Sequence, residues 1–278
     1  MIIRKFWDSD RVFRHSVVYR YLELCGYNVV LSNNEPPRIS ISNLRKNFGE
    51  INDIIYGPGR GSVDFDALAY NDTSLVIGEV KTRLIPRIFK ETRSLETVRK
   101  FIEYHISDPI NAKKFWDYLK SMGKIQRYLD NETSISELGK ELLGVIVKED
   151  IRGLFNKSTN IYVGLFTIDM FKNASYYNEL LNDILNLIEW FVSVLKNKGM
   201  LYDKKFGAFI VLFRPRGFTD TCVPSSFDIS VLGDKICSSN TELLKDIEWG
   251  IGIAGCDKCN YKKYCRILMG ELGTKCLR

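Results

Sequence analysis

The sequence lacks any long uninterrupted apolar run. No stretch approaches the about 18 uncharged apolar residues that would indicate a membrane-spanning helix. The first residues, MIIRKFWDSDRVFR, also lack the apolar segment of a secretory signal peptide. No long low-complexity tract is present, and the apolar content is near the globular norm. We therefore expect a globular, cytoplasmic protein with no membrane association.

Histidine is scarce, whereas cysteine is not. The 278 residues include two His and seven Cys. Disulfides are disfavoured inside mesophilic cells, so this cysteine content favours metal binding over cross-linking. The net charge of +6 and the pI near 8.8 are compatible with a polyanionic partner without establishing one.

The stretch from Ser62 to Thr82, SVDFDALAYNDTSLVIGEVKT, has the pattern of a β-hairpin. Residues 63–70 alternate as in a half-buried strand, with one predicted face made of Val63, Phe65, Ala67 and Ala69 and the other of Asp64, Asp66, Leu68 and Tyr70. Residues 71–74 have the composition of a turn. A second strand from Leu75 to about Thr82 would place Glu79 and Lys81 on one face.

The predicted hairpin gathers Asp66 or Asp64 with Glu79 and Lys81 at one end. Two carboxylates at such a point bind a hard divalent cation, and a lysine beside them can orient a water and offset phosphate charge. An ordinary surface ion pair is the alternative. Both strands, however, are apolar enough to be buried, and buried charge is costly unless it is paired or metal-bound. We expect Asp66 and Glu79 to be the metal ligands, with Asp64 as second choice for the aspartate.

These residues resemble the signature of the PD-(D/E)XK nuclease superfamily, which has an Asp at a strand start, a short gap and Glu-x-Lys on the next strand. Asp66 lies thirteen residues before Glu79, and DALAYNDTSLVIGEVK is similar to that signature throughout. The resemblance implies a restriction-endonuclease-like α/β core, with a mixed central sheet flanked by helices. It also implies a phosphodiester hydrolase that depends on Mg²⁺ or Mn²⁺.

A helix, a glycine and a strand precede the hairpin. Asp8 or Ser9 can cap a helix that runs to about Cys25, Gly26 is its C-terminal stop, and residues 27–32 are a predicted strand. In many members of the superfamily the first helix carries an extra active-site carboxylate or a histidine. His15 stands where that residue is expected, although a histidine on an apolar helix face is also an ordinary core residue. Glu50 and Asp53 are alternative candidates for the extra carboxylate.

The remaining chain alternates between predicted helices and strands. Some RecB-like relatives carry Gln and Tyr on a helix after Glu-x-Lys, but the spacing of Gln126 and Tyr128 departs from that pattern, so we assign them no role. Residues 130–143 and 175–196 read as helices, and residues 161–168 and 206–213 as strands. The motif FRPRGFTD then predicts a turn that closes the core. We therefore expect a nuclease-like core domain over residues 1–220, with a helical insertion near 84–145. A cysteine-rich metal-binding segment would follow over residues 221–278.

Positive charge gathers directly after the predicted catalytic strand. Residues 82–127 contain eleven Lys and Arg against five Asp and Glu. A phosphate backbone would need neutralising at this point, whereas the alternative is a solvated helical face.

The last residues carry the motif GCDKCNYKKYC, in which Cys256, Cys259 and Cys265 have C-x2-C-x5-C spacing. Three thiolates so close favour a soft or borderline metal, and the fourth ligand is either Cys276, nearest in sequence, or the distant Cys25. Together with the hairpin, this motif resembles RecB-like, CRISPR-associated exonucleases and related end-processing nucleases. The resemblance implies a [4Fe-4S] cluster bound by one N-terminal and three C-terminal cysteines. A structural Zn²⁺ site is the alternative, and Cys222 and Cys237 are read as structural.

We therefore expect a metal-dependent deoxyribonuclease in DNA end processing, repair or antiviral defence. Its partners would be single-stranded DNA or duplex ends, and proteins of a defence or repair complex. The alternative from another class is a catalytically silent nucleic-acid-binding or scaffold subunit that keeps the nuclease fold. An RNA nuclease also stays open, because the chemistry at the phosphate is shared.

Overall fold

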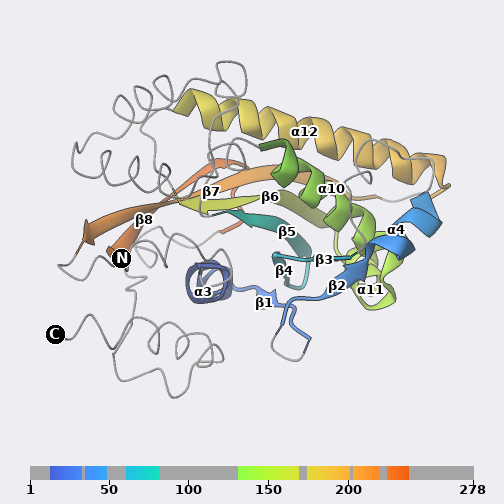
Figure 1. Cartoon of the computed structure of the whole chain (residues 1–278), viewed down its shortest axis with the longest axis horizontal. Coiled ribbons are helices and arrows are strands. Elements are labelled where there is room, and N and C mark those ends of the chain that lie inside the picture. The colour runs from blue at the N-terminus through green and yellow to red at the C-terminus, as the bar shows by residue number, and fades with distance from the viewer. Residues whose placement is uncertain are drawn as a thin grey trace.

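The computed structural model of the chain describes residues 13–32, 35–48, 61–81, 131–168, 174–200, 203–218 and 224–237. In these ranges the chain forms an α/β fold in which helices flank both faces of a mixed six-stranded sheet, as Figure 1 shows. The fold class expected from the sequence is confirmed at this level. None of the helices in these ranges combines the length and the apolar character needed to cross a membrane.

The six-stranded sheet has the strand order β1-β4-β5-β6-β7-β8. Its strands are β1 (Asn28–Val29), β4 (Ala67–Tyr70), β5 (Ser74–Lys81), β6 (Asn160–Ile168), β7 (Lys205–Phe218) and β8 (Pro224–Gly233). The central strands β5, β6 and β7 are parallel, whereas β4 and β8 pair antiparallel with their neighbours. Parallel strands are stable where both faces are covered, and here helices cover both.

Two apolar clusters fix the layers. On one face the sheet packs against α10 (Asn131–Val147) and α12 (Ala174–Asn197), and α4 (Ile41–Phe48) and α11 (Glu149–Lys157) join the same cluster. On the other face it packs against the first helix, which comprises η1 (Arg14–Val18) and α3 (Tyr19–Leu24). Figure 1 shows α10 and α12 on one side of the sheet and α3 on the other.

Strand β5 lies between these two layers. Leu75 and Ile77 belong to the α10 and α12 cluster, whereas Val76 and Val80 belong to the first-helix cluster. Because side chains alternate along a strand, Glu79 and Lys81 lie on the α10 side. The predicted second strand of the hairpin is therefore confirmed, and so is the turn, where the Asn71 side chain accepts the Ser74 N–H at 2.8 Å.

The first half of the hairpin differs from the prediction. Instead of one strand over residues 63–70, β3 (Ser62–Asp64) pairs with β2 (Arg38–Ser40) in a separate two-stranded sheet, and β4 then enters the main sheet. The chain bends at Phe65 and Asp66, so Phe65 packs on the α10 side while Ala67 and Ala69 pack on the first-helix side. The predicted shared face of Phe65 with the two alanines is wrong, because the bend resets the alternation.

Other predicted elements keep their places with altered ends. The first helix ends at Leu24, and Gly26, predicted as its stop, follows with a φ of 83° that suits glycine, while the predicted start of the helix lies outside the described residues. The predicted strand at 27–32 is reduced to β1. The strand at 161–168 and the helices at 130–143 and 175–196 are confirmed as β6, α10 and α12.

The predicted turn after residue 213 is wrong. Strand β7 continues through Arg214 to Phe218 and pairs antiparallel with β8. The main sheet therefore includes residues beyond the predicted domain boundary at 220. The Pro and Gly residues of FRPRGFTD do not end strand β7, because β8 pairs with it along this stretch.

Glycines permit close contact at the centre of the sheet. Gly164 of β6 lies beside Phe209 of β7, and a Cβ built on it would overlap the Phe209 carbonyl oxygen and ring. Gly153, in contrast, is an exposed position in α11 with no atom near its would-be Cβ.

We expect Gly164→Ala to destabilise the protein by about 1–3 kcal/mol or more, because the backbone of β7 cannot move away without breaking the sheet. The control Gly153→Ala should instead stabilise by about 0.5–1 kcal/mol, since alanine favours a helix. Urea unfolding measures both. Equal stability of the Gly164 variant and the parent chain would contradict the close packing of β6 and β7.

Candidate active site

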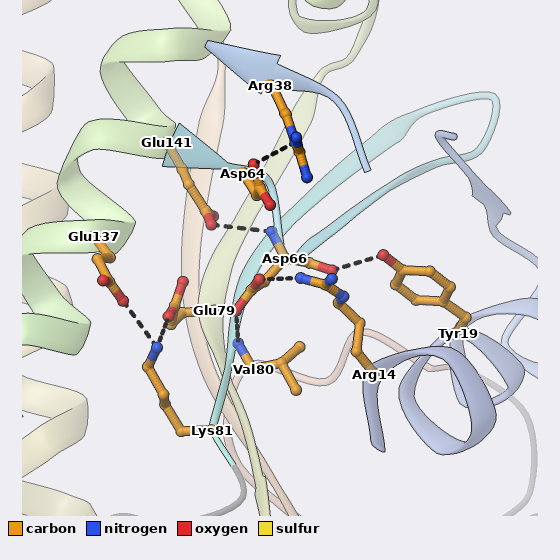
Figure 2. A network of polar contacts seen from close by, with 10 residues as sticks. All are labelled: Arg14, Tyr19, Arg38, Asp64, Asp66, Glu79, Val80, Lys81, Glu137 and Glu141. Atoms are coloured by element: carbon orange, nitrogen blue, oxygen red, sulfur yellow. Dashed lines mark hydrogen bonds and ion pairs between the residues drawn. The ribbon is translucent and has the colours of Figure 1, made fainter. Parts of the chain in front are cut away.

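Asp66 sits at the bend between β3 and β4, and four groups hold it. Its Oδ1 forms an ion pair with Nη1 of Arg14, and its Oδ2 accepts the Val80 N–H at 3.2 Å. Its own N–H donates to Oε1 of Glu141 at 3.1 Å, and its carbonyl oxygen accepts the Tyr19 hydroxyl at 2.9 Å. Figure 2 shows that these partners come from the first helix, β5 and α10. The bend thus places one carboxylate where three layers meet.

Glu79 and Lys81 reach the same place from β5. Glu79 is 2% exposed, and its Oε1 forms an ion pair with the Lys81 ammonium group. Lys81 also donates to Oε2 of Glu137 at 2.8 Å, and its side chain keeps 23% of its surface exposed. The structure therefore brings Asp66, Glu79 and Lys81 together, with Lys81 at the solvent side of the group (Figure 2).

Glu137 and Glu141 of α10 also belong to this site, and neither is among the residues predicted from the sequence. They are four residues apart, so both lie on the face of α10 that packs on β5. Glu141 is 0% exposed. A signal for them does exist in the sequence, because two acids share a helix face with Leu138 and Leu142, which are apolar enough to predict burial.

Burial dominates the electrostatics of this cluster. Loss of solvent raises the pKa of both Glu79 and Glu141 well above the usual 4.5, and the negative charge of Asp66 raises each further. Burial would also raise the pKa of Glu137, but hydrogen bonding with Glu79 and the charge of Lys81 outweigh it and lower that pKa.

The cluster holds more acid than base. Asp66, Glu79, Glu137 and Glu141 contact one another or share partners, and within the described ranges Arg14 and Lys81 form ion pairs with them. Arg14 is buried; burial would lower its pKa, but the charge of Asp66 outweighs this and raises it. Fully ionised, these side chains would carry two negative charges in excess, which is the charge that one divalent cation would balance.

The donor set fits a hard divalent cation, which prefers carboxylate oxygens. Asp66, Glu79 and Glu141 supply such oxygens, and Oε2 of Glu141 is buried with no hydrogen-bond partner among the described residues. As the side chains stand, no three His, Cys, Asp or Glu residues in the described ranges are arranged as a ready metal cage. Arg14 and Lys81 instead occupy oxygens of Asp66 and Glu79.

The two other predicted catalytic residues lie near the cluster. Asp64 forms an ion pair with Arg38 at 2.9 Å on the two-stranded sheet, with a third of its side chain exposed. His15 is fully buried in η1, where its ring packs edge-on against Tyr19 with the centroids 4.7 Å apart. Its neighbour Arg14, which is not among the predicted site residues, is the first-helix residue that forms an ion pair with Asp66.

The cysteines divide into two groups. Cys25 forms a disulfide with Cys237, and the two Cα atoms are 4.9 Å apart. A sulfur in a disulfide does not supply the thiolate that metals bind, so Cys25 in this state is not the cluster ligand that the sequence suggested. The predicted ligands Cys256, Cys259, Cys265 and Cys276 lie outside the described residues, as do Glu50, Asp53 and Gln126.

In comparisons with known proteins, no protein-family model, no curated protein and no solved structure matches this chain. The arrangement of its own side chains is therefore what bears on its chemistry.

We expect Glu141→Gln to stabilise the metal-free protein, and increasingly so as the pH rises. A carboxyl group whose pKa is raised by folding holds its proton in the folded chain after the unfolded chain has lost it, so its contribution to stability falls above about pH 4.5. Glutamine removes this loss. The free energy of unfolding of the variant should exceed that of the parent by about 1 kcal/mol or more at neutral pH and above.

Urea unfolding in EDTA between about pH 5 and about pH 8 measures the difference between variant and parent. Glu189→Gln, the same substitution at an exposed position of α12, is the control for the change of residue type. A gain from Glu141→Gln that does not vary with pH would contradict the raised pKa of Glu141.

Proposed function

We propose that the chain is a metal-dependent nuclease that hydrolyses phosphodiester bonds, with DNA as the substrate. One observation carries the proposal: two carboxylates, the buried Glu79 and the partly exposed Asp66, meet Lys81 between three layers of the fold. A buried acidic cluster of this kind is costly unless it serves a charged ligand. Asp66 and Glu79 would hold Mg²⁺ or Mn²⁺, which when bound supplies Lewis-acid stabilisation to the phosphate.

Lys81 is suited to act on the attacking water or on a phosphate oxygen. Its ammonium group is held between Glu79 and Glu137, so its position is defined, and it stays partly exposed, so substrate can reach it. In a site with little water its positive charge would stabilise the charge that develops on the phosphate. Asp66 is positioned by its backbone contacts with Tyr19 and Glu141, which leave its carboxylate directed at Arg14 and Val80.

The order of elements supports placement in the PD-(D/E)XK superfamily. A helix precedes the β4–β5 hairpin, and α10 and the parallel strand β6 follow it, with Asp66 at the start of β4 and Glu79 and Lys81 on β5. The restriction-endonuclease-like core, the RecB-like branch and a role in end processing, repair or defence are parts of this proposal. They rest on the residues that resemble the signature.

The second metal site is also a proposal and rests on sequence. Cys256, Cys259 and Cys265 would bind a [4Fe-4S] cluster or, as the alternative, Zn²⁺. Pairing of Cys25 with Cys237 favours Cys276 as the fourth ligand.

A second candidate function follows from the ion pairs. Arg14 and Lys81 engage the carboxylates of Asp66 and Glu79, so the cluster is partly neutralised without a metal. This favours, as the alternative, a nucleic-acid-binding or scaffold subunit that keeps the fold but does not cleave. Binding of DNA without metal-dependent cleavage would distinguish it from the nuclease.

Lys81→Ala and Glu79→Gln should each lower Mn²⁺-dependent cleavage by at least about 100-fold, because each removes a group that acts on the reacting phosphate. The assay uses labelled single-stranded DNA, duplex DNA and RNA, each with Mn²⁺ and with EDTA. Lys157→Ala, at an exposed position at the end of α11, is the matched control and should keep full activity. Cleavage by the Lys81 variant at the parent rate on every substrate would exclude the proposed mechanism.

Asp66→Asn and Asp64→Asn should differ sharply in the same assay. Asp66 lies within the acidic cluster, so its loss should lower cleavage by at least about 100-fold. Asp64 is paired with the exposed Arg38, and loss of such a pair costs about 1 kcal/mol or less, so activity should stay within about fivefold of the parent. The reverse ranking would move the metal site to the two-stranded sheet.

A further inference from the structure

Glu141 has a buried oxygen that the described part of the protein leaves without a partner. Its side chain is 0% exposed, and Oε1 accepts the Asp66 N–H at 3.1 Å. Oε2 is equally inaccessible and makes no hydrogen bond among the described residues. A buried carboxylate oxygen without a partner loses its hydration with nothing in return, so it calls for an explanation.

The packing of α10 fixes the direction of this side chain. Glu141 lies between Leu138 and Leu142, which are fully buried in the cluster under β5, and α10 contacts both β3 and β5. Figure 2 shows Glu141 directed from α10 toward Asp66 and Glu79. Since its neighbours are fixed in the core, Glu141 cannot turn out to solvent, and Oε2 stays among the acidic side chains.

A purely structural role does not account for a carboxylate here. The hydrogen bond to the Asp66 N–H needs only an acceptor, and the amide oxygen of a glutamine would supply it with no charge to bury. An ionised carboxylate costs several kcal/mol more to bury than an amide, and here Asp66 and Glu79 add like-charge repulsion. A neutral acceptor would suffice for this hydrogen bond, so an ionisable acid at this position favours a cationic partner.

We propose that Glu141 is a third carboxylate ligand of the divalent cation held by Asp66 and Glu79, with Oε2 as its donor atom. This inference rests on the proposed function for the cation, and it assigns to α10 a ligand that the hairpin motif does not contain. The chemistry is that of a hard divalent cation such as Mg²⁺ or Mn²⁺, because every donor is a carboxylate oxygen.

Glu137 supplies a matched comparison on the same helix. It lies one turn before Glu141, and its Oε2 accepts from Lys81 at 2.8 Å, with 36% of its side chain exposed. Its charge is therefore already paired, and it is closer to solvent. Neutralising Glu137 removes the same charge from α10 as neutralising Glu141, but it leaves the buried oxygen in place.

The test is calorimetric titration of the full chain with Mn²⁺ in the absence of nucleic acid. Glu141→Gln should weaken Mn²⁺ binding by about tenfold or more, because even residues behind metal ligands contribute that much. Glu141→Asp, which keeps the charge on a shorter side chain, should lie between the parent and Glu141→Gln. Glu137→Gln should stay within about threefold of the parent, the effect of a partly exposed ion pair. Circular dichroism and urea unfolding establish that each variant is folded.

Equal Mn²⁺ affinity of Glu141→Gln and the parent would overturn the assignment, and so would an absence of Mn²⁺ binding by the parent. A similar loss in Glu137→Gln and Glu141→Gln would also overturn it, since the effect would then be one of general charge. Cleavage assays separate this inference from the proposed function. Mn²⁺ binding that depends on Glu141, without any cleavage, would support Glu141 as a ligand and contradict the nuclease. Cleavage by the parent, with unchanged Mn²⁺ affinity in Glu141→Gln, would support the nuclease and contradict Glu141 as a ligand.

Discussion

The burial of carboxyl groups at one point is the constraint on which the described fold depends. Glu79 and Glu141 are buried beside the partly exposed Asp66, between the sheet and two helical layers, where water screens their repulsion poorly. Arg14 and Lys81 offset part of this cost through ion pairs, and the Val80 N–H offsets a little more. Apolar residues of similar size would fill the same space without the remaining cost.

The architecture around the cluster holds these charges in place. The bend between β3 and β4 turns Asp66 out of the strand alternation, while β5 presents Glu79 and Lys81 toward α10. Gly144 lets α10 come close, since a Cβ there would meet Ile39 and Phe65 next to the bend. Each layer supplies at least one charged group, so no single element contains the site.

Local pattern made part of this site predictable. Asp66, Glu79 and Lys81 lie within one hairpin, where a period of two and a turn composition are enough to bring them together. Glu137 and Glu141 follow after more than fifty residues, and no local rule sets how α10 meets β5. The first helix shows a different limit: η1 is a π-helical turn, with the Tyr19 N–H bonded to the Arg14 carbonyl oxygen, so the usual helical period misjudges which residue faces Asp66. The bend at Phe65 and Asp66 and the long β7–β8 hairpin likewise depend on partners that are distant in sequence.

Arg14 and Lys81 also determine what binding at this site requires. Oxygens of Asp66 and Glu79 that bind a cation must first give up, or share, their contacts with these two side chains. The two side chains are not equivalent. Lys81 is partly exposed and could turn toward a phosphate, whereas Arg14 is buried in the first-helix layer and stays close to Asp66. Affinity for the proposed cation would therefore depend on the difference between its contacts with these carboxylates and the ion pairs that it replaces. If the proposed cation binds here, Glu141 would favour the metal-bound state, since its buried Oε2 would gain the partner that it lacks among the described residues.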